Sequence, residues 1–319
     1  MADTTKRIGV SVAGQDTKEV LARIRHMEEM GIQAAWLTTG GAGRDGLAVF
    51  AAAGAQTHRI MLGTSIVPLW LRHPIAVAQQ VRVIAELAPG RFRLGIGPSH
   101  QAGMERLIGT DFKAPLGHLR EYVQVLKPLL QEGQVDFDGS YYHAHAQLGA
   151  KYDVPVMASA LRQRSFELCG EEADGAITWL CPAPYVRDVG LPALGRGATA
   201  KGRATPPLVA HAPVCVHDDP AEARAAMREQ MGNYPSNRFY TEMLAAAGYP
   251  EVMETKAWND RMIDGVMFHG NEREVERRLR EMLASGASEI VVSPVLAGQD
   301  RPASLERTLR LLAKVSASI

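Results

Sequence analysis

The sequence lacks several features that would point directly to a protein class. Its 319 residues contain three cysteines, Cys169, Cys181 and Cys215, which are far apart and form no Cys-x-x-Cys pair. This usage argues against a disulfide framework and against a zinc site, and it predicts buried, reduced thiols. The 35 basic and 35 acidic side chains cancel, so no global field attracts nucleic acid or an anionic membrane surface.

Long apolar runs and targeting signals are also missing. No run approaches the roughly 20 apolar residues that a membrane span requires. The first seven residues, Met1–Arg7, lack the apolar core of a signal peptide. We therefore expect a cytoplasmic protein that has neither a membrane partner nor a nucleic-acid partner.

What the sequence does contain is a regular alternation of apolar strands and amphipathic helices. The strands are continuous apolar runs, as expected for parallel strands that are covered on both faces. Eight βα units in a chain of this length favour an α/β TIM barrel over an open doubly wound sheet. The eight strand runs are 8–13, 32–37, 60–66, 92–97, 154–158, 175–179, 208–216 and 289–293.

Three segments interrupt this repeat, and we interpret them as excursions inside one domain that spans 1–319. They are about 134–150, which is predicted to form a hairpin, and two Gly- and Pro-containing stretches at 180–207 and 232–264.

A motif that competes with the TIM-barrel interpretation begins at Gly95-Ile96-Gly97. It fails as a dinucleotide-binding fingerprint, because Pro98 intrudes and His100 stands where the third glycine belongs.

In a TIM barrel the active site lies at the C-terminal ends of the strands. The residues expected there are mostly small, apolar or hydroxyl-bearing. They offer no carboxylate pair, metal-ligand cluster or Ser-His-Asp set, which counts against hydrolase and metal mechanisms. Such a pocket is typical of an enzyme whose large flat cofactor brings the chemistry with it.

Two stretches resemble the bacterial luciferase-like superfamily: Leu62–Ile66 with the following Arg72-His73-Pro74, and Leu87–Gly97. The segment Ala158–Arg162, ahead of Ala173-Asp174-Gly175, is similar to the branch that uses the deazaflavin coenzyme F420. The resemblance covers nearly the whole chain. It implies a TIM barrel, coenzyme F420 as the cofactor with FMN as the alternative, and a homodimer.

The resemblance also implies how the cofactor is held. A non-prolyl cis peptide, by position Ser65-Ile66, would support the ring from behind, and the loop after the fourth strand would follow the ring edge. Backbone amides before Arg162 would bind the phosphate at a helix start. The cofactor-binding residues implied in this way are Thr64, Ser65, Ile66, Gly97, Pro98, Ser99, Ala158, Ser159, Ala160, Leu161, Arg162 and Gly175.

Basic residues in two places bear on the phosphate and on the acidic tail of the coenzyme. Arg162 and Arg164 stand in the first turn of a predicted helix, where the helix dipole disfavours cations unless an anion is bound. In the 180–207 excursion, four basic residues either meet the acidic tail or are solvated surface charges. These four are Arg187, Arg196, Lys201 and Arg203.

The chain departs from the sugar-phosphate dehydrogenases of this family, which carry Asp-His after the second strand and a glutamate after the fourth. Here these positions are Thr39-Gly40 and His100, so a sugar phosphate is not the expected substrate.

His100 is the candidate catalytic residue that donates or takes the proton accompanying hydride transfer, because imidazole titrates near neutral pH. The alternative is a histidine that only bonds a backbone group. Thr39, Trp70 and Trp179 are candidates for the substrate pocket.

The expected function is an oxidoreductase that transfers a hydride between coenzyme F420 and an unsaturated or carbonyl-type small molecule. Two alternatives stay open. One is an FMN-dependent monooxygenase that a separate flavin reductase supplies, and the other is a barrel that binds a flavin-like ligand without turnover.

Overall fold

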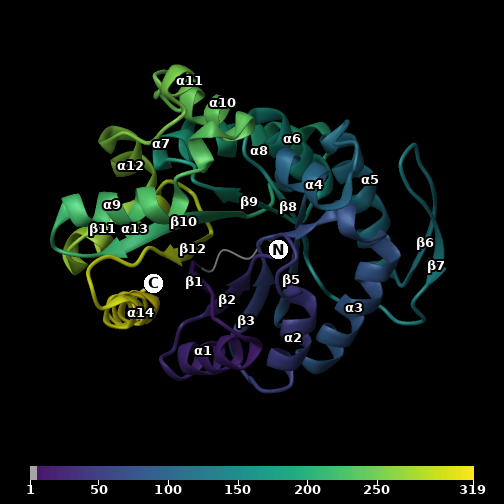
Figure 1. Cartoon of the computed structure of the whole chain (residues 1–319). Coiled ribbons are helices and arrows are strands. Elements are labelled where there is room, and N and C mark those ends of the chain that lie inside the picture. Colours follow the sequence, from purple (N-terminus) through teal and green to yellow (C-terminus); the bar gives the residue numbers. More distant parts are fainter. Residues whose placement is uncertain (1–5) are drawn as a thin grey trace.

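Eight parallel strands form a closed barrel in the computed structural model, which describes residues 6–319 (Figure 1). Consecutive barrel strands pair with one another, and the pairing of β12 with β1 closes the ring. The predicted TIM barrel is therefore confirmed, and all eight predicted strands are present. They are β1 (Arg7–Ser11), β2 (Ala34–Leu37), β3 (Met61–Thr64), β5 (Phe92–Gly97), β8 (Val156–Ser159), β9 (Gly175–Trp179), β10 (Leu208–Val216) and β12 (Glu289–Pro294).

Helices cover the outside of this barrel (Figure 1). Their starts follow local sequence signals: Asp16 and Asp45 cap α1 and α2, and His73 caps α3 by accepting the amide of Ile75 at 3.3 Å. The helices that alternate with barrel strands are α1 (Thr17–Glu29), α2 (Gly46–Gly54), α3 (Pro74–Leu87), α5 (Pro115–Lys127), α6 (Gln163–Glu172), α8 (Leu191–Ala200), α9 (Pro220–Met231), α13 (Glu272–Ala284) and α14 (Arg301–Ser316).

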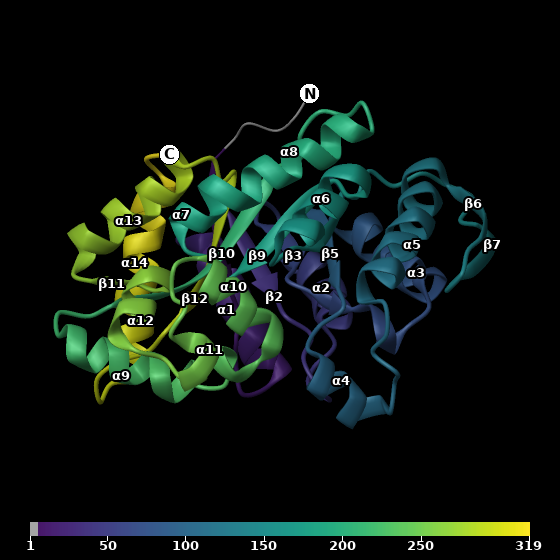
Figure 2. The ribbon, with the colours of Figure 1, turned by 90° about the horizontal axis from the view of Figure 1, so that it is seen from above.

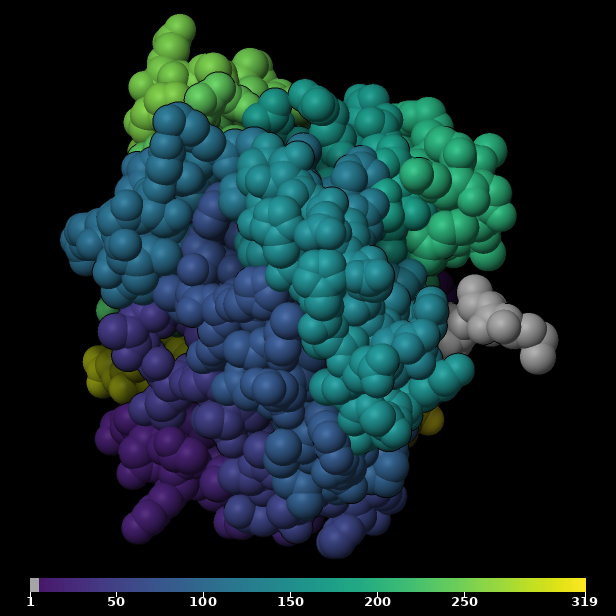
Figure 3. Space-filling model, turned by 90° about the vertical axis from the view of Figure 1, so that its right-hand side faces the viewer, coloured from purple at the N-terminus to yellow at the C-terminus, as the bar shows by residue number. Residues whose placement is uncertain are grey.

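The predicted hairpin is present as β6 (Gln134–Asp138) and β7 (His143–Gln147), which pair in an antiparallel way. It lies beside α5 at the outer edge of the molecule, and the space-filling view shows this region on the surface (Figures 2 and 3). His143 and His145 alternate along β7, and their rings hydrogen-bond to Asp138 and Asp136 respectively. None of the helices described, from residue 6 onwards, is both long and apolar enough to span a bilayer.

The two segments interpreted as irregular excursions are largely helical. Within 180–207, α8 packs along α6 so closely that a methyl group on Gly197 would lie 2.0 Å from the carbonyl oxygen of Glu167. The glycines of this stretch thus serve close helix packing, which composition alone does not distinguish from a loop. The remaining elements are β4 (Val67–Pro68), η1 (Leu69–Leu71), α4 (Gln101–Ile108), η2 (Pro128–Glu132), α7 (Ala183–Tyr185), η3 (Val186–Gly190), η4 (Tyr234–Ser236), α10 (Arg238–Ala246), α11 (Val252–Thr255), α12 (Asp260–Val266) and β11 (Phe268–Gly270).

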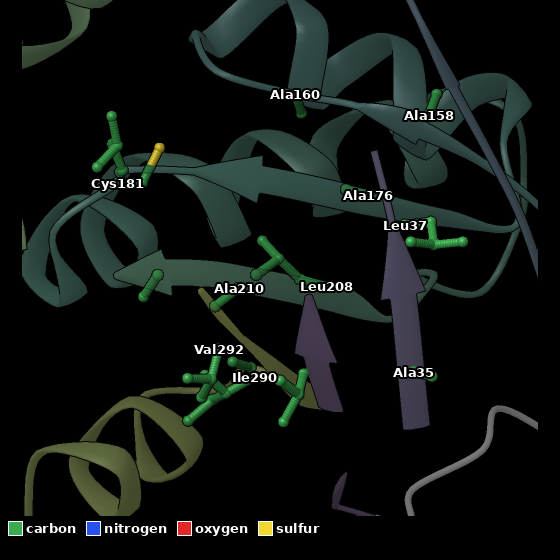
Figure 4. Close-up of a cluster of buried hydrophobic side chains, with 14 of the residues drawn as sticks. Ala35, Leu37, Ala158, Ala160, Ala176, Cys181, Leu208, Ala210, Ile290 and Val292 are labelled. Atoms are coloured by element: carbon green, nitrogen blue, oxygen red, sulfur yellow. The ribbon is translucent and has the colours of Figure 1, made fainter. Parts of the chain in front are cut away.

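Side chains alternate along each barrel strand between two separate cores, because successive residues of a strand point to opposite faces. Figure 4 shows side chains of the larger core, which packs between the barrel and the helices; Ala35, Ala176 and Ile290 belong to it. The smaller core fills the inside of the barrel. Its buried members are Ala34, Trp36, Met157, Ile177, Val209 and Val291.

A buried polar group completes the inside of the barrel towards the N-terminal ends of the strands. The indole of Trp36 donates to Glu289 Oε1 at 2.7 Å, and both terminal nitrogens of Arg93 bond the same carboxylate. The guanidinium carbon of Arg93 lies 4.6 Å from the centre of the Trp36 ring. Methyl groups on Gly9 or Gly63 would lie 2.7 Å from this ring, so the two glycines make room for it.

We expect Glu289→Ala to lower the free energy of unfolding by about 3–5 kcal/mol, because it leaves the buried Arg93 charge unpaired. Glu281→Ala is the matched control, since it removes an exposed carboxylate whose pairing with Arg277 contributes at most about 1 kcal/mol. Urea denaturation of both variants measures the difference. Equal losses in the two variants would contradict the structural role assigned to Glu289.

Candidate functional site

Eight inward-facing positions surround the C-terminal opening of the barrel, and we call them the mouth ring. Each lies two residues beyond an inward-facing residue of the same strand, and therefore faces inward itself. None of the eight carries a formal charge at neutral pH. They are Ser11, Thr38, Ser65, Gly97, Ser159, Trp179, His211 and Ser293.

The end of β3 is fixed by the end of β2. The peptide bond between Ser65 and Ile66 is cis, which confirms the predicted position. The Ser65 carbonyl accepts a hydrogen bond from the Thr38 hydroxyl at 2.7 Å, and the Ile66 carbonyl accepts one from the Thr39 amide at 3.2 Å. The Ser65 amide in turn donates to the Leu37 carbonyl at 2.8 Å. The backbone here is held on both sides of the Ser65-Ile66 peptide.

Three residues predicted from separate motifs meet at the mouth ring. A methyl group on Gly97 would lie 2.2 Å from Ser159 Oγ and 3.3 Å from Ile66 Cγ1. The ends of β3, β5 and β8 therefore converge on the same place, and only glycine fits at position 97. Thr64 is fully buried, and its hydroxyl bonds both the amide and the carbonyl of Gly95 at 2.8 Å, so it fastens β3 to β5.

Two of the residues predicted to line the substrate pocket form hydrogen bonds that hold loops in place. The Trp70 indole donates to the Pro98 carbonyl at 2.8 Å, next to Ser99 with its left-handed φ of 59°. Thr39 is buried, and its hydroxyl accepts the amide of Gly46 at the start of α2. Both side chains therefore use their polar atoms within the chain, and contact between either of them and a substrate stays a prediction.

His100 precedes α4 and is enclosed by the 232–264 segment. Its Nδ1 accepts from the Asn237 side-chain amide at 3.1 Å. The orientation of this amide is fixed because its oxygen accepts the Phe239 amide at 3.3 Å. Neutral His100 therefore carries its proton on Nε2, and desolvation lowers its pKa below the ordinary value. The imidazole is set up as a neutral hydrogen-bond donor.

The amides expected to bind a phosphate are partly used within the chain. Ala160 donates to the Ile177 carbonyl at 2.8 Å, and the Leu161 and Arg162 amides both donate to Ser165 Oγ at 3.0 Å. The first two amides of α6, those of Gln163 and Arg164, precede any intrahelical acceptor. Phosphate binding at this helix start stays a prediction. The Arg162 guanidinium pairs with Glu242 of α10.

Sequence reasoning missed a pair of polar residues in the mouth ring. His211 Nε2 lies 2.8 Å from Ser293 Oγ, and the His211 ring centre lies 4.4 Å from that of Trp179. Burial lowers the pKa of His211 to about 3, so the imidazole is neutral at physiological pH. The signal was present in the sequence, because His211 stands two residues after the inward-facing Val209.

Two tyrosines of the 232–264 segment were missed as well. Tyr234 has its ring centre 5.6 Å from that of His100 and 5.7 Å from that of Trp179, and Tyr240 lies 5.5 Å from His100. Burial raises the pKa of both phenols, so they stay protonated. The segment thus adds an aromatic wall to one side of the mouth ring.

A family model described as luciferase-like monooxygenase matches residues 2–301. The chain belongs to this luciferase-like family. An F420-dependent glucose-6-phosphate dehydrogenase from Beutenbergia cavernae is 34% identical over 201 residues, which cover 60% of this chain and 59% of that protein. A 5,10-methylenetetrahydromethanopterin reductase from Methanolobus tindarius is 25% identical over 308 residues, or 90% of this chain and 92% of that protein.

A solved structure shows the same fold over its full length. An F420-dependent secondary alcohol dehydrogenase in complex with an F420-acetone adduct superposes with a TM-score of 0.82 at 18% identity, covering 98% of both chains. At this identity the match shows the fold and no more.

Some positions that the luciferase-like resemblance suggested lie away from the mouth ring. Gly175 is the first residue of β9, at the opposite end of the barrel, where a methyl group would lie 2.2 Å from Met157 Cε. Its assignment as a cofactor residue is wrong, because this glycine makes room for Met157. Ala158 is fully buried, and its side chain belongs to the helix-facing core.

The basic residues suggested for the acidic tail are all engaged within the chain. Arg203 donates to the carbonyls of Gly170, Glu171 and Ala173, at the C-terminal end of α6 and far from the barrel opening. The tail-binding role is therefore wrong for Arg203. The other three pair with acidic neighbours: Arg187 with Asp188, Arg196 with Glu167, and Lys201 with Glu172.

In an NMR titration of the imidazole resonances, we expect His100 to titrate below its ordinary value of 6.5 and to carry its proton on Nε2. Asn237→Asp should raise this pKa, because a carboxylate beside Nδ1 stabilises the imidazolium. Asn259→Asp is the control, since Asn259 caps α12 in the same way that Asn237 caps α10. Identical His100 titrations in all three proteins would refute this arrangement.

Acid should destabilise the fold partly through His211. Between its folded pKa of about 3 and its ordinary value of 6.5, the unfolded chain binds a proton that the folded chain does not, so stability falls as pH falls. This one group contributes up to about 1.4 kcal/mol per pH unit in that window. His211→Gln should lose stability less steeply than the wild type in urea denaturation between about pH 7 and pH 5. Parallel curves would contradict a neutral, buried His211.

Proposed function

We propose that this protein is an oxidoreductase that transfers a hydride between coenzyme F420 and an unsaturated or carbonyl-type small molecule. The observation that carries the proposal is the mouth ring, whose members other than Trp179 and His211 are glycine, serine or threonine. Such a ring offers backbone and hydroxyl groups to a flat ligand and has no charged side chain, and its one imidazole, His211, is kept neutral by burial. Relatives named as F420-dependent support the choice of cofactor.

The residues present fit a planar ring system. Ile66, Gly97 and Ser159 form a close-packed surface on which no further side-chain atom fits. When bound, coenzyme F420 supplies a deazaflavin ring that carries the hydride and reacts poorly with oxygen. The chain supplies the support: the held Ser65-Ile66 backbone, the loop 97–99 that Trp70 fastens, and the free amides at the start of α6 for an anion.

His100 would act at the substrate through its Nε2 proton. Because Asn237 occupies Nδ1, the neutral ring presents a donor and no acceptor to the site. This deepens the expectation that His100 handles a proton: the ring donates a hydrogen bond to the substrate atom on which negative charge develops.

A sugar phosphate is disfavoured as the substrate. The mouth ring carries no cationic side chain, and Arg162, at the start of α6, is paired with Glu242. The likeness to glucose-6-phosphate dehydrogenases spans 59% of the matched relative and does not decide the substrate.

Titration of the purified protein with coenzyme F420 and with FMN tests the proposal, and we expect tighter binding of F420. Gly97→Ala should weaken this binding by at least about tenfold, because its methyl group displaces Ser159 and Ile66. Gly40→Ala is the control, since its methyl group would meet no atom within 4 Å. Tighter binding of FMN, with oxygen consumption when reduced flavin is supplied, would favour an FMN-dependent monooxygenase instead.

A further inference from the structure

The tip of the β6–β7 hairpin is fastened to α5 by one carboxylate. Glu121 accepts three consecutive backbone amides of the turn, those of Ser140 at 2.8 Å, Tyr141 at 2.7 Å and Tyr142 at 3.0 Å. A methyl group on Gly139 would lie 2.3 Å from Glu121 Oε2, so glycine fits beside this carboxylate and a side chain does not. The hairpin lies at the edge of the molecule, outside α5, and this clamp fixes the position of its tip (Figures 1 and 2).

The clamp places Tyr141 against the start of α5. Its ring centre lies 4.0 Å from that of His118, and a methyl group on Gly117 would lie 2.8 Å from Tyr141 Cε2. Desolvation lowers the pKa of His118 below its ordinary value, so this ring is neutral at physiological pH. The His118 ring centre lies 4.5 Å from that of Trp70 in η1. Three rings from the hairpin, α5 and η1 therefore follow one another, and we call Tyr141, His118 and Trp70 the aromatic chain.

The inner end of the aromatic chain meets the loop that follows β5. The Trp70 indole donates to the Pro98 carbonyl at 2.8 Å, and the next residue, Ser99, has a left-handed φ of 59°. A serine is unfavourable in this conformation by itself, so contacts from outside the loop have to hold it there. Trp70 provides such a contact directly before His100.

We propose that Tyr141 and His118 are positioning residues, which act through Trp70 to hold the loop 97–99 in the conformation that binds the coenzyme. Tyr141 is 41% exposed and contributes little to the core, yet the Glu121 clamp keeps it on His118. The inference rests on the proposed function and goes beyond it, since it assigns part of the coenzyme affinity to a hairpin outside the barrel.

Hydrogen exchange of the indole N–H groups, followed by NMR, tests the hold on the loop. In Tyr141→Ala we expect the Trp70 N–H to exchange about two- to tenfold faster than in the wild type, the effect of losing one aromatic pair. The N–H groups of Trp36 and Trp258 are bonded elsewhere in the chain, and their exchange should stay the same. Equal acceleration of all three would show a general loss of stability and would overturn the proposal.

Titration with coenzyme F420 measures the effect on the site. Tyr141→Ala and His118→Ala should each weaken binding by about two- to tenfold. The double variant should lose less than the product of the two, because both residues act through the same aromatic chain. His118→Phe keeps a neutral ring and should restore most of the affinity. His143→Ala is the matched control, since it removes an imidazole of the same hairpin that pairs with the exposed Asp138, and it should bind as the wild type does.

The outcomes separate this inference from the proposed function. Unchanged Trp70 exchange in Tyr141→Ala, faster exchange with wild-type F420 affinity, or full additivity in the double variant would each overturn the inference. A wild-type protein that binds no F420 would overturn the proposed function, and the Trp70 exchange would still decide whether the aromatic chain holds the loop. Because Tyr141 lies at the surface, its variant keeps the test decisive even where His118→Ala does not fold.

Discussion

The contact among Trp36, Glu289 and Arg93 is what the rest of the barrel depends on. An indole, a carboxylate and a guanidinium occupy the space inside the strands, and two glycines on neighbouring strands yield the room that the indole needs. Because these three polar groups pair with one another there, the interior is filled without a long apolar side chain from every strand. The inward-facing positions nearer the C-terminal ends of the strands can then carry small residues. These small residues leave the opening of the barrel available to a ligand.

The same packing explains why the site is made of backbone and hydroxyl groups. The side chains of Ile66 and Ser159 lie so close to Gly97 that a methyl group there would contact both, and hydrogen bonds from the end of β2 hold the Ser65-Ile66 backbone. A surface of this kind recognises shape and offers no reactive group. Chemistry at such a surface has to come from a bound molecule, which agrees with the membership of the chain in the luciferase-like family.

The sequence predicted the strands, the hairpin and the Ser65-Ile66 position, because continuous apolar runs, turn residues and a family motif are local signals. Prediction from the sequence failed where the role of a residue depends on which end of the barrel that residue occupies. Gly175 and Arg203 lie close in the chain to site residues, yet the structure places both at the far end of the barrel. It also failed for 180–207, since glycines that permit close helix packing and glycines that form loops look alike in one sequence.

His211 illustrates a different limit. Its inward orientation could have been read from the alternation along β10, but its partners Ser293 and Trp179 come from other strands, and only the barrel register brings them together. The tautomer of His100 likewise depends on Asn237, which lies 137 residues further along the chain.

Helix α10 links two parts of the site that are distant in the sequence. Its capping residue, Asn237, orients the His100 imidazole, and one turn further along, Glu242 pairs with Arg162 beside the free amides of α6. The N-cap residue of α6 and the imidazole that precedes α4 are therefore both tied to α10. A displacement of this one short helix would move the partners of both Arg162 and His100 together, although these two residues stand 62 positions apart in the chain.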